Sequence, residues 1–271
     1  MILQDLSPAA LVAAIEENLF SWVPIFGNLG RACADDPPGV IRSITDLPLS
    51  LFNSVMDARL APDQVDPAIE RVLSEAGERK VPLLWWTGPS TRPADLGKRL
   101  EERGFAFDEE SPGMAADLAN LNEGLPAPHG LRIALARDDA SWQLCGRIMG
   151  LGFEVPAAKL DVMANAWHQL LAQADPETTL AYIGWWNGEP VATSLLQLGG
   201  GVAGIYAVGT IPAARRRGIG AQMTLHPLIH ARRMGYRVGV LGASEMGFGV
   251  YRSLGFQEYC RLREYVWRPP S

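Results

Sequence analysis

The chain lacks the cysteine content of a disulfide-stapled or zinc-binding protein. Its 271 residues include three cysteines, Cys33, Cys145 and Cys260, which are far apart and odd in number. It also lacks an excess of basic charge, because 24 Lys and Arg stand against 30 Asp and Glu and leave a net charge of -6. A field of this sign repels polyanions, so we expect no nucleic-acid partner. The thiols are expected to be reduced, as in a cytoplasmic protein.

Histidine and long apolar runs are also scarce. Only four histidines occur, and they show no metal-ligand spacing. Two of them, His226 and His230, share a helical face without a third ligand, so no metal is expected. The first residues carry Asp5, Glu16 and Glu17 and lack the order of a secretory signal. Because Trp, Gly, Pro or charge interrupts each apolar run before the ~20 residues of a membrane span, we expect a cytoplasmic protein without a membrane partner.

What the chain does contain is enough apolar sequence for two cores. Hydrophobic residues make up 48% of it, and domains most often run to ~100–150 residues. The stretch 120–130 is rich in Pro, Gly and Asn, and a new strand pattern begins directly after it. We therefore expect one domain over 1–125 and a second over 126–271.

Both halves show a mixed α/β pattern. In the first half, apolar spacing predicts a helix that opens at Ser7 and ends at Pro24. The other elements predicted there are strands at 49–60 and 81–87 and helices at 65–76 and 94–103. In the second half, the predicted order is β-α-α-β-β-β-α-β-α-β. Asn187-Gly188 predicts a tight hairpin between strands at 180–186 and 191–198, because both residues accept a positive φ.

A faint internal repeat connects the two halves. Residues 83–90, followed by a helix and Gly104-Phe105, match residues 238–244, followed by a helix and Gly255-Phe256. The first half is therefore interpreted as a degenerate copy of the second. The alternative is coincidence, since any strand and helix followed by Gly and a buried Phe would give the same match.

The most informative segment is 208–221, VGTIPAARRRGIGA, between a predicted strand and a predicted helix. A turn that opens a helix presents free backbone N–H groups at the positive end of the helix dipole, which suits a pyrophosphate. Gly218 and Gly220 let the main chain approach phosphates without a Cβ. The positive side chains of this segment are Arg215, Arg216 and Arg217.

Arg215-x-x-Gly218-x-Gly220 resembles the acyl-CoA signature of the GNAT acetyltransferase superfamily. A second landmark, Tyr251 followed by Leu254-Gly255-Phe256, resembles the downstream ending of that family. The resemblance covers about residues 131–268. It implies acetyl-CoA as co-substrate and a coenzyme site made of Ala207, Val208, Gly209, Thr210, Arg215, Arg216, Arg217, Gly218, Ile219, Gly220 and Ala221.

Other interpretations of this turn fit less well. A dinucleotide fingerprint would need a third glycine, and a P-loop would need a Gly-Lys-Ser/Thr ending. Three arginines are short for a nucleic-acid tract in an acidic chain. A solvated basic turn at the start of a helix remains the alternative without a ligand.

The resemblance also implies catalytic groups. Free N–H groups of Ala207, Val208 and Thr210 would receive the thioester carbonyl and the pantetheine arm, where strand four of the family diverges from strand five. Tyr251 would be the general acid for the sulfur, a role that calls for a lowered pKa; the alternative is a packed helix aromatic. No base is assigned, because 191–210 contains no Asp, Glu or His, and Glu189 and Glu245 suit a turn and a helix start.

We therefore expect an α/β (α+β) fold of tandem GNAT-like domains, each with a mixed, mostly antiparallel sheet flanked by helices. The expected activity is direct transfer of an acetyl group to a primary amine of a small molecule or peptide, with the first domain as a structural or acceptor-site wall. Two alternatives stay open, a non-catalytic acyl-CoA-binding module and a transferase for longer acyl-CoA. The chain is expected to be a monomer or homodimer.

Overall fold

The computed structural model describes residues 1–34 and 39–270, and these form two compact units. The first unit combines Met1–Asn18 with Gly113–Tyr259, and the second combines Leu19–Pro112 with Cys260–Ser271. Each unit thus takes segments from both ends of the sequence. This division differs from a single cut after residue 125, because a strand from each half belongs partly to the other unit.

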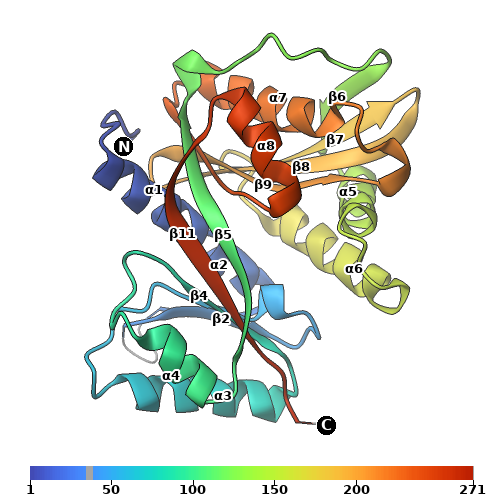
Figure 1. Cartoon of the computed structure of the whole chain (residues 1–271). Helices are drawn as coiled ribbons and strands as arrows, with labels where there is room; N and C mark the ends of the chain where they lie inside the picture. Colours follow the sequence, from blue (N-terminus) through green and yellow to red (C-terminus); the bar gives the residue numbers. More distant parts are fainter. Residues whose placement is uncertain (35–38, 271) are drawn as a thin grey trace. The chain divides into compact units, whose positions relative to one another are not determined.

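The first unit is a mixed sheet with helices on both faces (Figure 1). Its neighbour order is β5-β10-β9-β8-β7-β6, with β9 and β10 parallel and the other pairs antiparallel. Its elements are α1 (Pro8–Phe20), β6 (Leu131–Leu135), α5 (Asp139–Gly152), α6 (Ala157–Gln173), β7 (Thr179–Trp186), β8 (Glu189–Gly199), β9 (Val202–Thr210), α7 (Ile219–Arg233), β10 (Val238–Gly242) and α8 (Glu245–Leu254). Two strands, β5 (Ala106–Asp117) and β11 (Gln257–Trp267), are divided between the two units. From β6 onward, this order confirms the predicted one.

The core of the first unit forms where α7 and α8 cover the sheet. Met223 and Leu228 of α7 and Leu196 of β8 are fully buried there. The predicted hairpin is also present: Asn187 has φ 52° and Gly188 has φ 89°, and the register runs from Trp186↔Glu189 through β7 and β8. The alternation of apolar residues was therefore sufficient to place these strands.

The second unit is a smaller sheet in the order β1-β2-β3-β4-β11. Its other elements are α2 (Trp22–Phe26), β1 (Gly30–Ala34), β2 (Ile41–Thr45), β3 (Ser54–Met56), α3 (Val65–Arg79), β4 (Leu83–Thr87) and α4 (Leu96–Glu102). The core on the α3 and α4 side includes Ile69, Leu83, Trp85 and Leu100, each fully buried.

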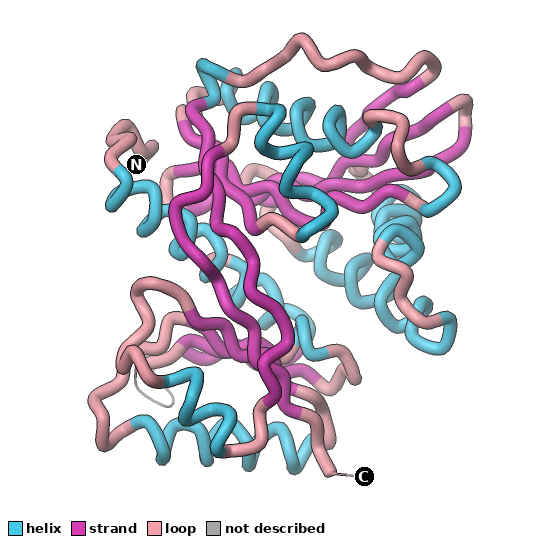
Figure 2. The backbone as a smooth tube through the Cα atoms, in the orientation of Figure 1, coloured by secondary structure: helices cyan, strands magenta, loops and turns pink. Residues whose placement is uncertain are grey.

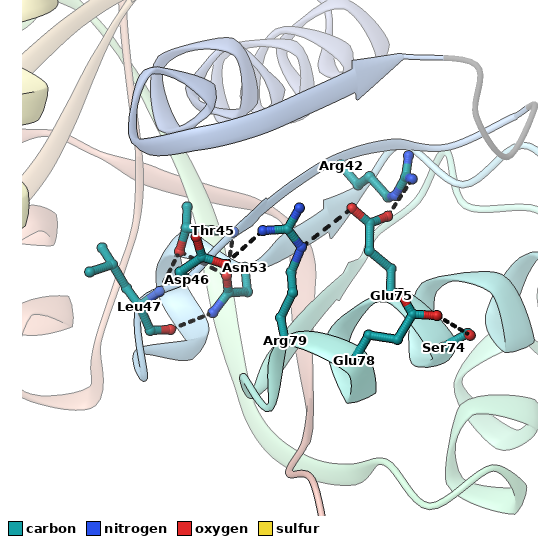
Figure 3. Close-up of polar contacts among 9 residues, drawn as sticks. All are labelled: Arg42, Thr45, Asp46, Leu47, Asn53, Ser74, Glu75, Glu78 and Arg79. Atoms are coloured by element: carbon teal, nitrogen blue, oxygen red, sulfur yellow. Dashed lines mark hydrogen bonds and ion pairs between the residues drawn. The ribbon is translucent and has the colours of Figure 1, made fainter.

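The predicted strand over 49–60 is wrong in length, and Asn53 explains why. Residues Ser50–Phe52 form a short 3-10 helix, and only Ser54–Met56 is a strand. The buried Asn53 amide donates to the carbonyls of Leu47 (2.9 Å) and Leu49 (3.0 Å), and its Oδ1 accepts from Thr45 N (2.7 Å) and Oγ1 (2.9 Å). Figure 3 shows the contacts of Asn53 with Thr45 and Leu47. A side chain that satisfies nearby main-chain groups in this way favours a turn over a ladder.

The predicted repeat is visible in the order of the elements. β4, α4 and β5 follow one another as β10, α8 and β11 do, and β5 and β11 are the long strands in Figure 2. Gly104 (φ 87°) and Gly255 (φ 107°) end the two helices in the left-handed region. Phe105 and Phe256 follow them and are both buried.

One helical stretch, Pro8–Leu29, is long and apolar enough to cross a membrane by length and composition. The expectation that no stretch would qualify was therefore wrong. Half of its apolar window is buried inside the protein, as in the core helix of a soluble protein, so this is weak evidence for a span.

Candidate active site

The turn between β9 and α7 has the backbone of an anion site. Gly218 is the N-cap of α7 with φ 80°, and Arg216 two residues earlier has φ 60°, so the turn alternates into the left-handed region. No side chain caps α7, whereas Asp138 caps α5 (2.9 Å to Ser141 N) and Ser244 caps α8 (3.2 Å to Gly247 N). The first N–H groups of α7 therefore remain available to an external acceptor.

The space in front of this turn is open enough for a phosphate group to approach the main chain. A Cβ added to Gly220 would meet nothing within 4 Å, and one on Gly218 would meet only the carbonyl of Pro126, at 3.5 Å. Phosphate oxygens can thus approach the main chain closely at both glycines. The residues present fit the pyrophosphate of an acyl-CoA.

The three arginines of the turn have different surroundings. Arg215 is anchored to the protein: its Nε donates to Thr210 O (3.0 Å), its Nη2 to Gly152 O (2.9 Å), and its Nη1 pairs with Glu154 (2.8 Å). Arg216 is exposed. Arg217 is also exposed, and its guanidinium carbon lies 4.6 Å from the ring centroid of Trp186. Arg217 and Arg216 can therefore face a ligand, whereas Arg215 holds the turn in place.

β9 and β10 share only a short parallel register. The pairs are Ala203↔Gly239 and Val240↔Gly204, near the start of β9, and the described strands show no pair beyond them. Further along β9 a bulge interrupts the register with β8, and Ala207 there has φ 49°. A non-glycine residue in this region is strained by about 1 kcal/mol or more, and such strain concentrates at functional sites. This divergence is where Ala207, Val208 and Thr210 were predicted to bind the thioester.

The turn between α5 and α6 lies against the end of β9, which sequence reasoning missed. A Cβ on Gly152 would lie 3.2 Å from main-chain atoms of Gly209 and Thr210, and one on Gly209 would lie 3.4 Å from the Phe153 ring. Phe153 is 54% exposed although it is large and apolar. The signal that could have pointed to this contact is the pair of glycines, since close backbone approach requires them.

Tyr251 lies on α8 and is buried, with its ring edge-on to Phe256 at 6.2 Å between centroids. Burial raises the pKa of the Tyr251 phenol to about 12. The expectation of a lowered pKa is therefore wrong, because desolvation outweighs any charge that would stabilise the phenolate. A thiol of pKa ~8.5 is the stronger acid, so complete transfer of the phenol proton to a thiolate would cost roughly 5 kcal/mol. The Tyr251 hydroxyl is suited to donate a hydrogen bond while it keeps its proton.

The geometry does not identify a general base for the site. Glu189 and Glu245 are exposed at the starts of β8 and α8. Glu154, near the end of β9, is engaged by Arg215. Among residues 1–34 and 39–270, no group of three His, Cys, Asp or Glu side chains could hold a metal ion.

Residues 147–256 match the model of the Acetyltransferase (GNAT) family. Among solved structures, a GCN5-related N-acetyltransferase from Kribbella flavida superposes with a TM-score of 0.70 at 19% identity, over 94% of this chain and 96% of that one. One from Sphaerobacter thermophilus gives 0.61 at 18% identity, over 86% and 78%. A tandem GNAT protein from the clavulanic acid biosynthesis pathway gives 0.60 at 13% identity, over 99% and 97%. A search of curated proteins found no significant match.

The first unit, with its divergent β9 and β10 and its glycine-rich helix start, thus contains a GNAT acetyltransferase domain. The chain as a whole has the fold of tandem GNAT proteins, as the sequence predicted. The match of residues 147–256 to this family implies acyl-CoA-dependent acetyl transfer.

Proposed function

We propose that this protein is an N-acetyltransferase that moves an acetyl group from acetyl-CoA directly to a primary amine of a small molecule or peptide. The observation that carries the proposal is the uncapped α7 start beside the bulge of β9. The start of α7 offers N–H donors for phosphates, and the bulge of β9 offers N–H groups for a carbonyl oxygen. Together they suit the two ends of an acyl-CoA.

The chemical step needs few protein groups. The amine nitrogen attacks the thioester carbonyl carbon, a C–N bond forms, the C–S bond breaks, and the proton lost by nitrogen is gained by sulfur through water. Main-chain N–H groups at Ala207 and Val208 would stabilise the carbonyl oxygen, each by an amount on the order of 3 kcal/mol. Tyr251 would donate a hydrogen bond to the departing sulfur.

The second unit lacks an equivalent coenzyme site. In that unit β3 is followed by α3 and then by the parallel strand β4, in the same way that β9 is followed by α7 and the parallel strand β10. However, the turn 57–64 contains no glycine, and Asp66 occupies the first turn of α3, where it pairs with Arg103 (3.3 Å). A carboxylate there repels a phosphate, so we expect one coenzyme per chain. A role of the first 125 residues in acceptor binding, the cytoplasmic location and the monomer or homodimer state stay predictions.

Calorimetric titration with acetyl-CoA, followed by a thiol-release screen of amines, tests the proposal. We expect micromolar binding at one site per chain, loss of binding in the Arg216→Glu, Gly218→Glu double variant, and turnover with at least one amine. Tyr251→Phe removes a hydrogen-bond donor to the departing sulfur, so it should lower kcat roughly 10²-fold and leave the acetyl-CoA Kd unchanged. Binding with no turnover on any amine would instead favour the non-catalytic acyl-CoA module, and no binding would refute the proposal.

A further inference from the structure

Trp186, at the end of β7, supports one arginine of the coenzyme turn. The guanidinium carbon of Arg217 lies 4.6 Å from the centroid of the Trp186 ring, within the range of a cation–π interaction. The ring is itself fixed, because its Nε1 donates to the carbonyl of His129 at 3.1 Å. A long side chain that would otherwise move freely in solvent is thus held in one position.

A cation–π contact is not a hydrogen bond, so it uses none of the five N–H donors of the arginine. These donors lie along the edge of the guanidinium plane, where they can reach a planar or tetrahedral anion. Within the described part of the chain, Arg217 makes no hydrogen bond or ion pair. Arg215, two positions earlier, directs its donors to Thr210, Gly152 and Glu154 instead. Arg217 is therefore the arginine whose donors are both ordered and free.

The support for Trp186 is attached to the start of α7 as well. Residues 125–130 run past this helix: Gln222 Nε2 donates to Leu125 O (3.0 Å), and Pro126 O is the nearest atom to an added Cβ on Gly218 (3.5 Å). The same short segment supplies the His129 carbonyl that fixes the indole. The ring, the segment and the helix start therefore form one connected frame around the turn.

The geometry points to Trp186 as a positioning residue that presents the edge of Arg217 to a phosphate group of the coenzyme. This rests on the proposed function and adds to it the residue pair that recognises the charged part of acyl-CoA. Because the arginine is already ordered, binding a phosphate costs less side-chain entropy than it would with a free arginine. The pair acts on recognition of phosphate and leaves the thioester chemistry untouched.

The test compares ligands with and without phosphate. Calorimetric Kd values are measured for acetyl-CoA, and kcat/KM is measured for S-acetylpantetheine, which carries no phosphate. We expect Arg217→Gln to raise the acetyl-CoA Kd about 10-fold and Trp186→Leu to raise it about 5-fold. The double variant should be no weaker than Arg217→Gln alone, because the ring acts through the arginine. Trp186→Phe, which keeps an aromatic face, should stay within about 2-fold of wild type.

A neighbouring pair across the adjacent strands β6 and β7 provides a matched control. Arg132 lies 5.3 Å from the ring centroid of Trp185, so Arg132→Gln and Trp185→Leu remove the same type of contact away from the turn, and the acetyl-CoA Kd should not change. An unchanged Kd in Trp186→Leu would overturn the inference, as would an equal loss with S-acetylpantetheine, which would indicate a structural effect. If wild type failed to bind acetyl-CoA, the proposed function itself would fail, and this inference with it.

Discussion

At the scale of single residues, Arg42 is the most buried cation among the second-unit side chains that the structure describes. Its side chain is 6% exposed, and its Nη2 lies 2.6 Å from Glu75 Oε2. Figure 3 shows this ion pair. Its Nε and Nη1 have no hydrogen-bond partner among the described residues. Glu75 thus compensates a charge that is already poorly solvated.

Glu75→Ala should lower the free energy of unfolding by about 3 kcal/mol, because it leaves that charge buried without its counterion. Glu102→Ala is the control, since Glu102 forms an exposed pair with Lys98 at 3.7 Å and should change stability by less than about 1 kcal/mol. Urea unfolding of both variants measures the difference. Equal effects would show that Arg42 is solvated without Glu75.

The burial of Tyr251 leads to a prediction about the pH dependence of kcat. Burial raises its pKa to about 12, so the neutral phenol that donates a hydrogen bond persists through the usual assay range and is lost only as the pH approaches 12. Between pH 8 and 10.5, we therefore expect the kcat of wild type and of Tyr251→Phe to follow pH profiles of the same shape. A descending limb near pH 10 that is present in wild type and absent from the variant would contradict this burial.

The predicted roles of the arginines show what a local motif leaves open. The spacing Arg215-x-x-Gly218-x-Gly220 gave the place of the turn, because glycines at a helix start have few other uses. It did not distinguish Arg215 from Arg217. Their partners, Glu154 and Trp186, are distant in sequence, and only tertiary structure brings them to the turn.

At the scale of elements, the two glycines at the start of α7 have different roles. Gly218 has φ 80° and is required by the turn, whereas Gly220 is the second residue of the helix, where alanine would restrict the unfolded chain and is favoured over glycine by about 0.5–1 kcal/mol. An added Cβ at Gly220 would meet nothing, so the fold does not require glycine there. A glycine at this position is better explained by close approach of a ligand to the main chain.

Gly220→Ala should therefore stabilise the free protein by about 0.5–1 kcal/mol and weaken acetyl-CoA binding at least several-fold. Gly77→Ala provides the control, because Gly77 is exposed in α3, has equally open space, and lies in the unit without the coenzyme turn. That variant should gain similar stability with no change in the acetyl-CoA Kd. Thermal unfolding and calorimetry measure both effects, and unchanged binding in Gly220→Ala would place the phosphates elsewhere.

Elements with regular patterns were predictable, and those defined by tertiary pairing were not. The order from β6 to β11 followed from alternation, the Asn187-Gly188 turn and helix spacing. β5 was missed because Asp108, Glu109 and Glu110 interrupt its apolar pattern, and its far end becomes a strand by pairing with β10 (Val238↔Asp117 to Gly242↔Gly113). The bulge at Ala207 has no sequence signal, because alanine rarely adopts a positive φ.

At the scale of the whole molecule, the GNAT fold is assembled from distant parts of the chain. The family match begins at residue 147, yet Met1–Asn18 belongs to the same compact unit. Leu3 N donates to Gly201 O (3.0 Å), and the buried Asn18 donates to Gln197 O (3.1 Å) and Gly199 O (2.9 Å) and accepts from the Tyr206 hydroxyl (2.7 Å). These contacts hold the hairpin that leads to the bulge of β9.

A fragment of residues 126–271 should therefore fail to unfold cooperatively, because it lacks both Asn18 and the Gly113–Asp117 segment that pairs with β10. Loss of activity in this fragment would then reflect its failure to fold, and it would not test whether the first domain forms a wall of the acceptor site. The sharper variant is Asn18→Ala in the full chain, which leaves two carbonyls and a hydroxyl without their amide and should cost about 2–3 kcal/mol. Tyr206→Phe removes one of those bonds and should cost about 1 kcal/mol. A fragment with a sharp thermal transition, or an Asn18→Ala variant as stable as wild type, would show that the GNAT domain folds without the N-terminal helix.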